Sequence, residues 1–282
     1  MEKNILAKRF LTGIIAIPLL VALIGWGSEE IFLIIVMLTA ALALIEFYKI
    51  NLASNESGKA LAVTVSLSLI WCIYYFQDSL SSFKIDGMDC FITWSIALIT
   101  LAVFMSLFFH LTLFPRNVIL VKKPLIAVIG MLYVGLFLSY LILIRSGTDG
   151  KSWVFFTLIL VWFSDTGAYA VGKMIGKNKL FPVISPNKTI EGYLGGLAAS
   201  LMAAFILKTF ILKDLPAIHC ILLALGIGVM GQLGDLLEST FKRANNLKNS
   251  GNLLPGHGGM LDRIDSLLFA APFVYYYKIL IL

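Results

Sequence analysis

Charge is scarce in this chain of 282 residues, of which only 13% are Asp, Glu, Lys or Arg. Hydrophobic residues make up 59% of the sequence, and the mean hydropathy is +0.92. Water-soluble globular domains are about half apolar and about a quarter charged, so this composition excludes an ordinary soluble protein. It predicts a polytopic integral membrane protein.

Cysteine is also scarce, and its spacing indicates no chemistry. Cys72, Cys90 and Cys220 lack the spacing of a zinc site or of a disulfide framework. The pattern G-x-x-x-x-G-K-[ST] is absent, which excludes a P-loop nucleotide site. Lys8 and Arg9 precede an apolar run without a small-residue cleavage site, so we expect an uncleaved first span rather than a signal peptide.

Long apolar segments, in contrast, are abundant. A helix that crosses a membrane needs about 20 mostly apolar residues. The segments that reach or approach this length are 10–26, 31–48, 61–76, 91–111, 125–144, 153–171, 190–212, 216–236 and 266–282. The sequence therefore predicts an all-α fold with about nine transmembrane helices.

Basic residues are distributed unevenly between the two ends of these spans. If the N-terminus is cytoplasmic, most of the 22 Lys and Arg residues fall in cytoplasmic segments. This bias is the one that orients membrane proteins. It predicts a multi-pass protein of the inner (cytoplasmic) membrane, with the loops around Ser185 and His257 in the cytoplasm and the C-terminus outside.

A polar stretch at 234–266 interrupts the apolar pattern. Its acidic residues include two pairs with the same spacing, Asp235 with Glu238 and Asp262 with Asp265. Residues three apart share one face of a helix, so each pair could direct its oxygens to one point. Oxygen atoms are the ligands that Mg²⁺ prefers, and Mg²⁺ commonly binds nucleotide phosphates as well.

The same stretch contains groups suited to phosphate. Its basic side chains are Lys242, Arg243, Lys248 and Arg263. The turn P-G-H-G-G includes Gly258 and Gly259, whose backbone N–H groups could approach phosphate oxygens. His257 could be a base, a phosphate donor or a turn residue, and we favour a phosphate donor. The alternative for the whole stretch is a solvated loop with salt bridges at helix ends.

Asp165 and Glu46 are carboxylates that lie inside predicted spans. Asp165 lies well within one, in W-F-S-D-T-G-A-Y, where a charge costs about 2.5–3.5 kcal/mol on insertion scales. It must face a wet cavity, a cation or a partner, and a structural pairing with Lys or Arg is the alternative. Glu46 lies near the end of the second span, where a function and simple contact with water are both open.

The segment S-P-N-K-T-I-E-G, at 185–192, contains the signals of a helix start. Ser185 and Pro186 suit the first positions, and Glu191 suits a capping role. A helix N-terminus that carries Asn187, Lys188 and Thr189 would bind anions, although an ordinary helix cap explains the pattern equally well. The spacing of Gly192 and Gly196 indicates a helix-packing face.

From Ser239 to Asp265 the sequence resembles the signature of the phosphatidate cytidylyltransferase (CDP-diacylglycerol synthase) family. The matching residues are S-T-F-K-R, then a second Lys, and finally P-G-H-G-G-M-L-D-R-I-D. Segments 162–169 and 185–192 extend the resemblance, which covers most of the chain and is weaker in its N-terminal part. One position departs, because the family has Asp where this chain has Asn249, which keeps an oxygen but loses the charge.

The resemblance implies a membrane nucleotidyltransferase that transfers CMP from CTP to phosphatidic acid, giving CDP-diacylglycerol and pyrophosphate in phospholipid biosynthesis. It implies Mg²⁺, with a second cation left open, and the residues expected to hold metal are Asp235, Asp262 and Asp265. The catalytic residues expected are Asp165, Lys188, Lys242, Arg243, His257 and Arg263. The substrate-binding residues expected are Ser185, Asn187, Lys188, Thr189, Lys248, Gly258 and Gly259.

On this interpretation the chain divides into N-terminal helices at 1–120, for anchoring or lipid access, and a catalytic membrane domain at 121–282. The expected partners are CTP, phosphatidic acid and the bilayer, without nucleic acid, and a homodimer is left open. One alternative is a cytidylyltransferase for another lipid phosphate. Another is an ion-coupled transporter, which is disfavoured because the charged motifs gather on one face rather than at the midplane.

Overall fold

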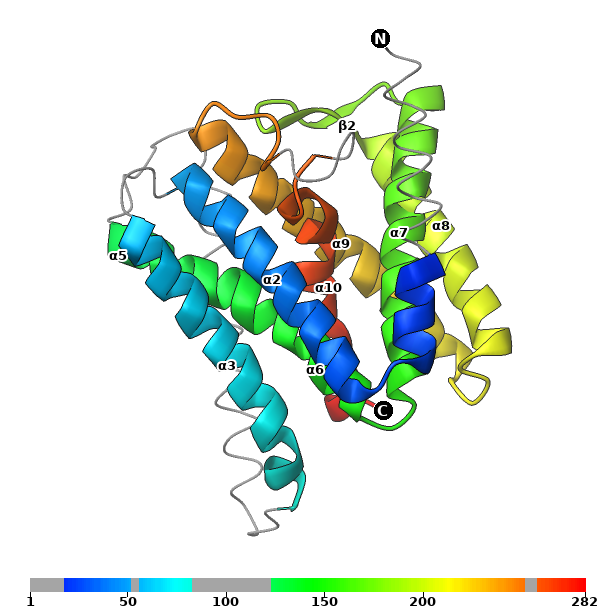
Figure 1. Ribbon diagram of the computed structural model, residues 1–282. Coiled ribbons are helices and arrows are strands. Elements are labelled where there is room, and N and C mark those ends of the chain that lie inside the picture. The colour runs from blue at the N-terminus through cyan, green and yellow to red at the C-terminus, as the bar shows by residue number, and fades with distance from the viewer. Residues whose placement is uncertain (1–17, 52–55, 83–122, 252–257) are drawn as a thin grey trace.

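The computed structural model describes residues 18–51, 56–82, 123–251 and 258–282, and almost all of its elements are helices (Figure 1). Residues 18–26 are helical, and the first labelled helices are α2 (Glu29–Asn51) and α3 (Glu56–Ser82). The helices that follow are α5 (Lys123–Gly130), the π-helix η1 (Met131–Leu136), α6 (Phe137–Ser146), α7 (Gly150–Ile175), α8 (Ile190–Phe210), α9 (Ala217–Ala244) and α10 (Leu261–Leu280). The predicted all-α fold class is confirmed for the described residues.

Five helical segments of the described chain are long and apolar enough to cross a membrane. They are Glu29–Asn51, Val128–Ser146, Gly150–Ile175, Ile190–Phe210 and Ala217–Ala244, and each overlaps a predicted span. A shorter apolar stretch, Lys59–Tyr75, overlaps the third predicted span, and α10 overlaps the last. The span predicted at 91–111 and the first part of the one at 10–26 lie outside the described residues, so the count of about nine stays a prediction.

A short antiparallel hairpin joins α7 to α8. Strand β1 (Lys179–Phe181) pairs with β2 (Ser185–Thr189), with Lys179 opposite Thr189. The helix start predicted at Ser185 and Pro186 is therefore wrong, because these residues belong to a strand. Helix α8 begins at Ile190 instead, where the hydroxyl of Thr189 accepts the Gly192 N–H at 3.1 Å and so caps the helix.

Glu191 has a different role from the predicted cap. Its carboxylate accepts hydrogen bonds from the backbone N–H groups of Lys177 and Asn178, at 3.1 and 3.2 Å. It also accepts one from the Asn178 side chain at 2.7 Å. Glu191 thus ties the start of α8 to the segment that follows α7, which fixes the base of the hairpin.

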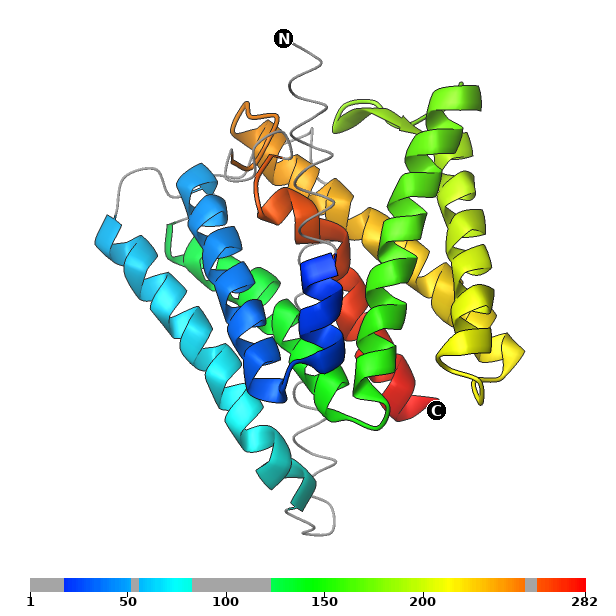
Figure 2. The ribbon, with the colours of Figure 1, turned by 45° about the vertical axis from the view of Figure 1, so that its right-hand side comes forward.

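Small residues allow α7 and α8 to lie side by side (Figure 2). A Cβ on Gly196 would overlap the carbonyl oxygen of Ser164, and one on Gly192 would overlap that of Ala168. The predicted packing role of these two glycines is confirmed. Asp165 lies on α7 and the hairpin connects α7 to α8, so this close helix packing fixes both.

Buried aromatic rings connect the N-terminal helices to the last two helices. Phe47 of α2 lies 5.2 Å from Phe241 of α9 and 6.1 Å from Tyr133 of η1, measured between ring centroids. Tyr133 in turn lies 6.2 Å from Phe269 of α10, edge to face. Such pairs stabilise a core beyond the area they bury. This core fixes α2, α9 and α10 relative to one another.

Candidate active site

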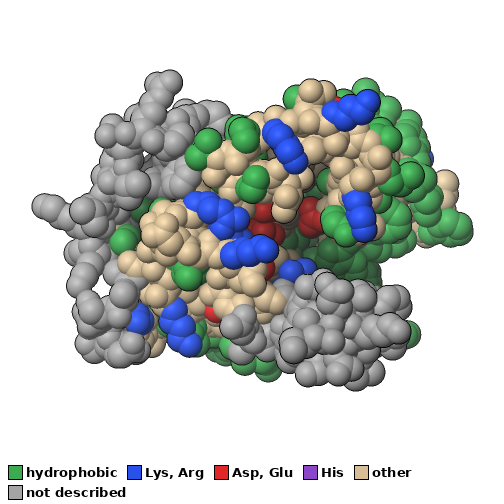
Figure 3. Space-filling view, turned by 90° about the horizontal axis from the view of Figure 1, so that it is seen from above, with side chains coloured by type: hydrophobic (Ala, Val, Ile, Leu, Met, Phe, Trp, Pro, Cys, Tyr) green, Lys and Arg blue, Asp and Glu red, His purple; other side chains and the backbone are tan. Residues whose placement is uncertain are grey.

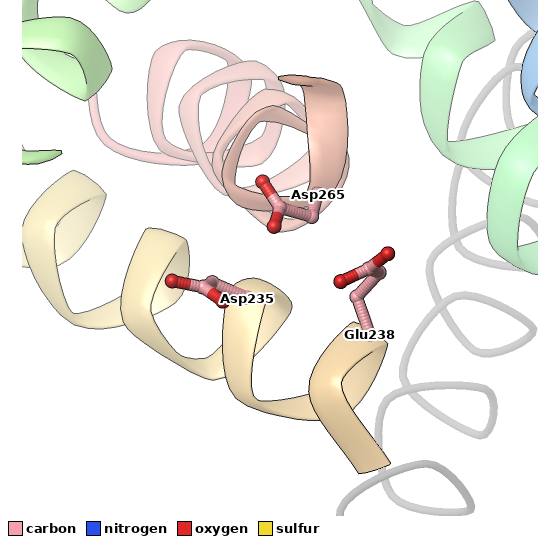
Figure 4. A group of neighbouring side chains, drawn as sticks. All are labelled: Asp235, Glu238 and Asp265. Carbon is pink, nitrogen blue, oxygen red and sulfur yellow. The ribbon is translucent and has the colours of Figure 1, made fainter. Parts of the chain in front are cut away.

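Three carboxylates from two helices form a compact acidic group (Figure 4). Asp235 and Glu238 lie on α9, and Asp265 lies on α10; each offers an oxygen, and these oxygens all lie within 4.8 Å of one another. Glu238 is 0% exposed and Asp265 is 9% exposed. Carboxylates held this close away from water repel one another unless a cation balances them.

The close approach of α9 to α10 at this point depends on a glycine. A Cβ on Gly234 would overlap the backbone carbonyl oxygen of Asp265. One turn earlier, a Cβ on Gly231 would lie 3.4 Å from the Ser266 Cβ, an ordinary contact. The sequence therefore places its smallest residue where the acidic group needs the two helices to be closest.

A lysine from the hairpin neutralises one edge of the acidic group. The Lys188 ammonium lies 2.6 Å from the Asp235 carboxylate and donates a hydrogen bond to the Gln232 side chain at 3.2 Å. Strand β2 carries Lys188, and the paired hairpin extends it toward α9. Lys188, which the resemblance implies to be catalytic and substrate-binding, therefore lies beside the acidic group.

A second lysine links the acidic group to the loop before α10. Lys242 forms ion pairs with Glu238 and with Asp262, the latter at 2.7 Å. Asp262 also accepts the backbone N–H groups of Gly259 at 2.8 Å and Ser250 at 3.1 Å. Both oxygens of Asp262 accept these hydrogen bonds, so Asp262 holds the segment before α10 next to Glu238, and the set of three carboxylates does not include it.

Asp165 lies beside the group but on another helix. Its carboxylate accepts a hydrogen bond from the Ser266 hydroxyl at 3.4 Å, which connects α7 to α10. The Asp165 residue is exposed although it lies in the interior of a long apolar helix. It therefore faces an accessible space, as its charge requires.

Of the other basic residues predicted to bind phosphate, one is hydrogen-bonded within the protein and two are exposed. Arg243 donates to the backbone carbonyls of Ile184, at 3.2 Å, and Leu247, so it ties the hairpin to the end of α9. Arg263 and Lys248 are exposed, and Lys248 lines a surface pocket of about 370 Å³ together with Lys49.

The remaining predicted residues lie in or near the hairpin and the loop. Asn187 is exposed and Ser185 is half-buried, while Thr189 is buried as the cap of α8. The backbone N–H of Gly259, expected to approach phosphate, donates a hydrogen bond to Asp262 instead. Gly258 has a φ of +83°, a conformation that favours glycine. His257 lies outside the described residues.

Viewed from the end that carries the hairpin, the molecule is hollowed at its centre (Figure 3). Acidic side chains are visible within the hollow, and Lys and Arg side chains surround it. An opening with cations at its rim and carboxylates at its floor suits a polyanion that arrives with a metal ion.

The fold and the site define a helical membrane protein with an acidic group at the end of its helices, and the comparisons with known proteins agree. The family model described as "Cytidylyltransferase family" matches residues 7–281. The chain belongs to this family.

Curated relatives carry a more specific name. A protein of Bacillus subtilis (strain 168) named phosphatidate cytidylyltransferase is 35% identical over 270 residues, which is 95% of this chain and 96% of the relative. A protein of the same name from Staphylococcus haemolyticus (strain JCSC1435) is 34% identical over 264 residues, 94% of this chain and 95% of the relative. The family resemblance found in the sequence is confirmed.

Proposed function

We propose that the chain is a membrane-embedded phosphatidate cytidylyltransferase, which transfers CMP from CTP to phosphatidic acid and releases pyrophosphate. In this reaction a phosphate oxygen of the lipid attacks the α-phosphorus of CTP. The bond between that phosphorus and the oxygen bridging to the β-phosphate breaks, and pyrophosphate leaves with the electron pair. The attacking oxygen is already anionic, so the reaction needs little or no general base.

The observation that supports this function most strongly is the acidic group. Asp235, Glu238 and Asp265 supply oxygen donors within 4.8 Å of one another, and Glu238 Oε1 is buried with no hydrogen-bond partner in the described chain. This donor set fits a hard divalent cation such as Mg²⁺, with these three residues as its ligands. A bound Mg²⁺ would neutralise charge on the triphosphate and on the departing pyrophosphate.

The lysines would supply the remaining positive charge. Lys188 reaches the edge of the group from the hairpin, and Lys242 reaches it from α9. Because the barrier arises mainly from repulsion between two anionic substrates, fixed cations and correct positioning should provide most of the catalysis. We assign Lys188 to the triphosphate because the hairpin carries its ammonium to the edge of the acidic group, 2.6 Å from the Asp235 carboxylate.

We place the hairpin and the loop before α10 on the cytoplasmic face, where CTP and Mg²⁺ are available. These two segments lie at the same end of the molecule, and the C-terminus lies at the opposite end (Figures 1 and 2). The excess of basic residues in the segments at this end supports the orientation.

The test is incorporation of radiolabelled CTP into lipid by the purified protein in detergent, with phosphatidic acid and Mg²⁺. We expect labelled CDP-diacylglycerol and release of one pyrophosphate for each lipid product. A polyprenyl phosphate offered as the alternative acceptor should give no product. Labelled lipid formed only with that acceptor would show that the enzyme uses a different lipid phosphate, and no nucleotidyl transfer to any acceptor would refute the proposal.

A further inference from the structure

A glutamate from the N-terminal half reaches the loop that precedes α10. Glu46, on α2, is 6% exposed. Its Oε2 accepts the backbone N–H of Leu261 at 2.9 Å and the hydroxyl of Ser250 at 3.1 Å. Both partners are more than two hundred positions away in the sequence. A buried carboxylate with such distant partners holds two parts of the chain together.

The contact with Leu261 caps α10 from outside the helix. The first N–H groups of a helix have no partner within it and need acceptors. The N-cap residue of α10 is Met260, which makes no side-chain hydrogen bond to the helix. Glu46 supplies the acceptor instead, and its negative charge is favourable at the positive end of the helix dipole.

Two glycines of the loop leave room for the carboxylate. A Cβ on Gly251 would overlap Glu46 Oε1. A Cβ on Gly259 would overlap both Glu46 Oε2 and the Ser250 hydroxyl oxygen. Gly251 and Gly259 therefore both lie against the Glu46 carboxylate, where a larger residue would not fit.

These contacts lead to the acidic group through three further contacts. Ser250, held by Glu46 through its hydroxyl, donates its backbone N–H to Asp262 at 3.1 Å. Asp262 holds Lys242, which pairs with Glu238. Leu261, the other partner of Glu46, lies one turn before Asp265 on α10.

We propose that Glu46 is a positioning residue for nucleotidyl transfer: from α2 it fixes the segment around Ser250 and the first turn of α10, and so fixes Asp262 and Asp265 relative to α9. The proposal rests on the proposed function. Glu46 does not belong to the acidic group, and it acts through backbone and hydroxyl groups. The N-terminal helices would thus shape the site as well as anchor the chain.

The test compares Glu46→Leu, which removes both acceptor contacts, with Glu46→Gln, which keeps a carbonyl oxygen for them. In the labelled-CTP assay we expect Glu46→Leu to lower kcat by about 10- to 100-fold, because misplacement by about 1 Å costs up to that much. Glu46→Gln should stay within about threefold of the unmodified protein, since hydrogen bonds to a neutral acceptor are weaker but present. KM for phosphatidic acid should be unchanged in both.

The matched control is Asn51→Ala, also on α2. Asn51 accepts a hydrogen bond from the side chain of Asn245, the C-cap of α9, at 3.1 Å, and so ties α2 to the end of α9 instead of to Ser250 or Leu261. Its kcat should stay within about twofold. Ser250→Ala, which removes one contact of Glu46, should lower kcat by about three- to tenfold. It replaces Glu46→Leu as the test if that variant does not fold.

The outcomes separate this proposal from the proposed function. An inactive unmodified protein would refute the function itself. An active unmodified protein with normal kcat in Glu46→Leu or in Ser250→Ala would overturn the positioning role of Glu46. Equal losses in Glu46→Gln and Glu46→Leu would also overturn it, because the two hydrogen bonds, which Gln keeps, would then not account for the loss.

Discussion

Lys242 is shared by two carboxylates, Glu238 on its own helix and Asp262 on the next. Together with Asp235, Asp265 and Lys188 they form a set in which carboxylates outnumber ammonium groups. When all are ionised, the excess of negative charge equals the charge of one divalent cation. Buried charges are stable only when they are balanced, so the set is suited to hold such an ion.

Asn249 is the position at which the chain departs from the pattern of its family, and we expect the departure to have little chemical effect. The residue is exposed and lines the surface pocket beside Lys248, and no residue of the acidic group lines that pocket. Asn249→Asp should change kcat by less than about tenfold, or about 1.4 kcal/mol of barrier. Steady-state kinetics with labelled CTP measure the effect, and a gain of a hundredfold would show that the missing charge matters for catalysis.

At the scale of single residues, the spacing of the carboxylates predicted part of the acidic group. It correctly indicated that Asp235 and Glu238 share a helix face, but our assignment of metal ligands took Asp262 and omitted Glu238. The structure shows Asp262 bound to Lys242 and to two backbone N–H groups, partners that depend on the path of the loop. The Asn near the end of α9 that adopts a left-handed conformation is Asn246, with φ of 56°.

At the scale of elements, the separation of α9 from α10 decides whether the acidic group forms. We expect Gly234→Ala to lower kcat by about 10- to 100-fold, because the new methyl group would overlap the Asp265 carbonyl oxygen and move α10. Gly231→Ala is the control, since its methyl group would make an ordinary contact with Ser266. Its kcat should stay within about twofold, and equal effects of the two substitutions would contradict this account of the helix packing.

Helix positions were predictable from hydropathy, whereas the hairpin was not. The apolar runs placed α7, α8 and α9 to within several residues, because burial and lipid contact both require long apolar segments. Residues 185–189 contain the composition of a helix start, and only pairing with residues 179–181 makes them a strand. The capping signal belongs to Thr189, four residues later than Ser185, the start expected from sequence.

At the scale of the whole molecule, the hairpin lies at one end of the helices and the turn between α8 and α9 lies at the other (Figure 2). We expect Asn187→Cys, in the hairpin, to resist an impermeant thiol reagent applied to intact cells. Lys213→Cys, in the α8–α9 turn, should react readily. Both are placed in a background without Cys72, Cys90 and Cys220, and the reverse pattern of labelling would overturn the cytoplasmic assignment of the site.

The central claim is that Asp235, Glu238 and Asp265 hold a divalent cation. It is tested most directly by equilibrium binding of Mn²⁺ to the purified protein in the presence of CTP, with free Mn²⁺ measured by electron paramagnetic resonance. We expect saturable binding by the unmodified protein, a loss of affinity of at least about 100-fold in Asp265→Asn, and a loss of less than about tenfold in Asp262→Asn. Undiminished Mn²⁺ binding by Asp265→Asn, together with its loss in Asp262→Asn, would contradict the account.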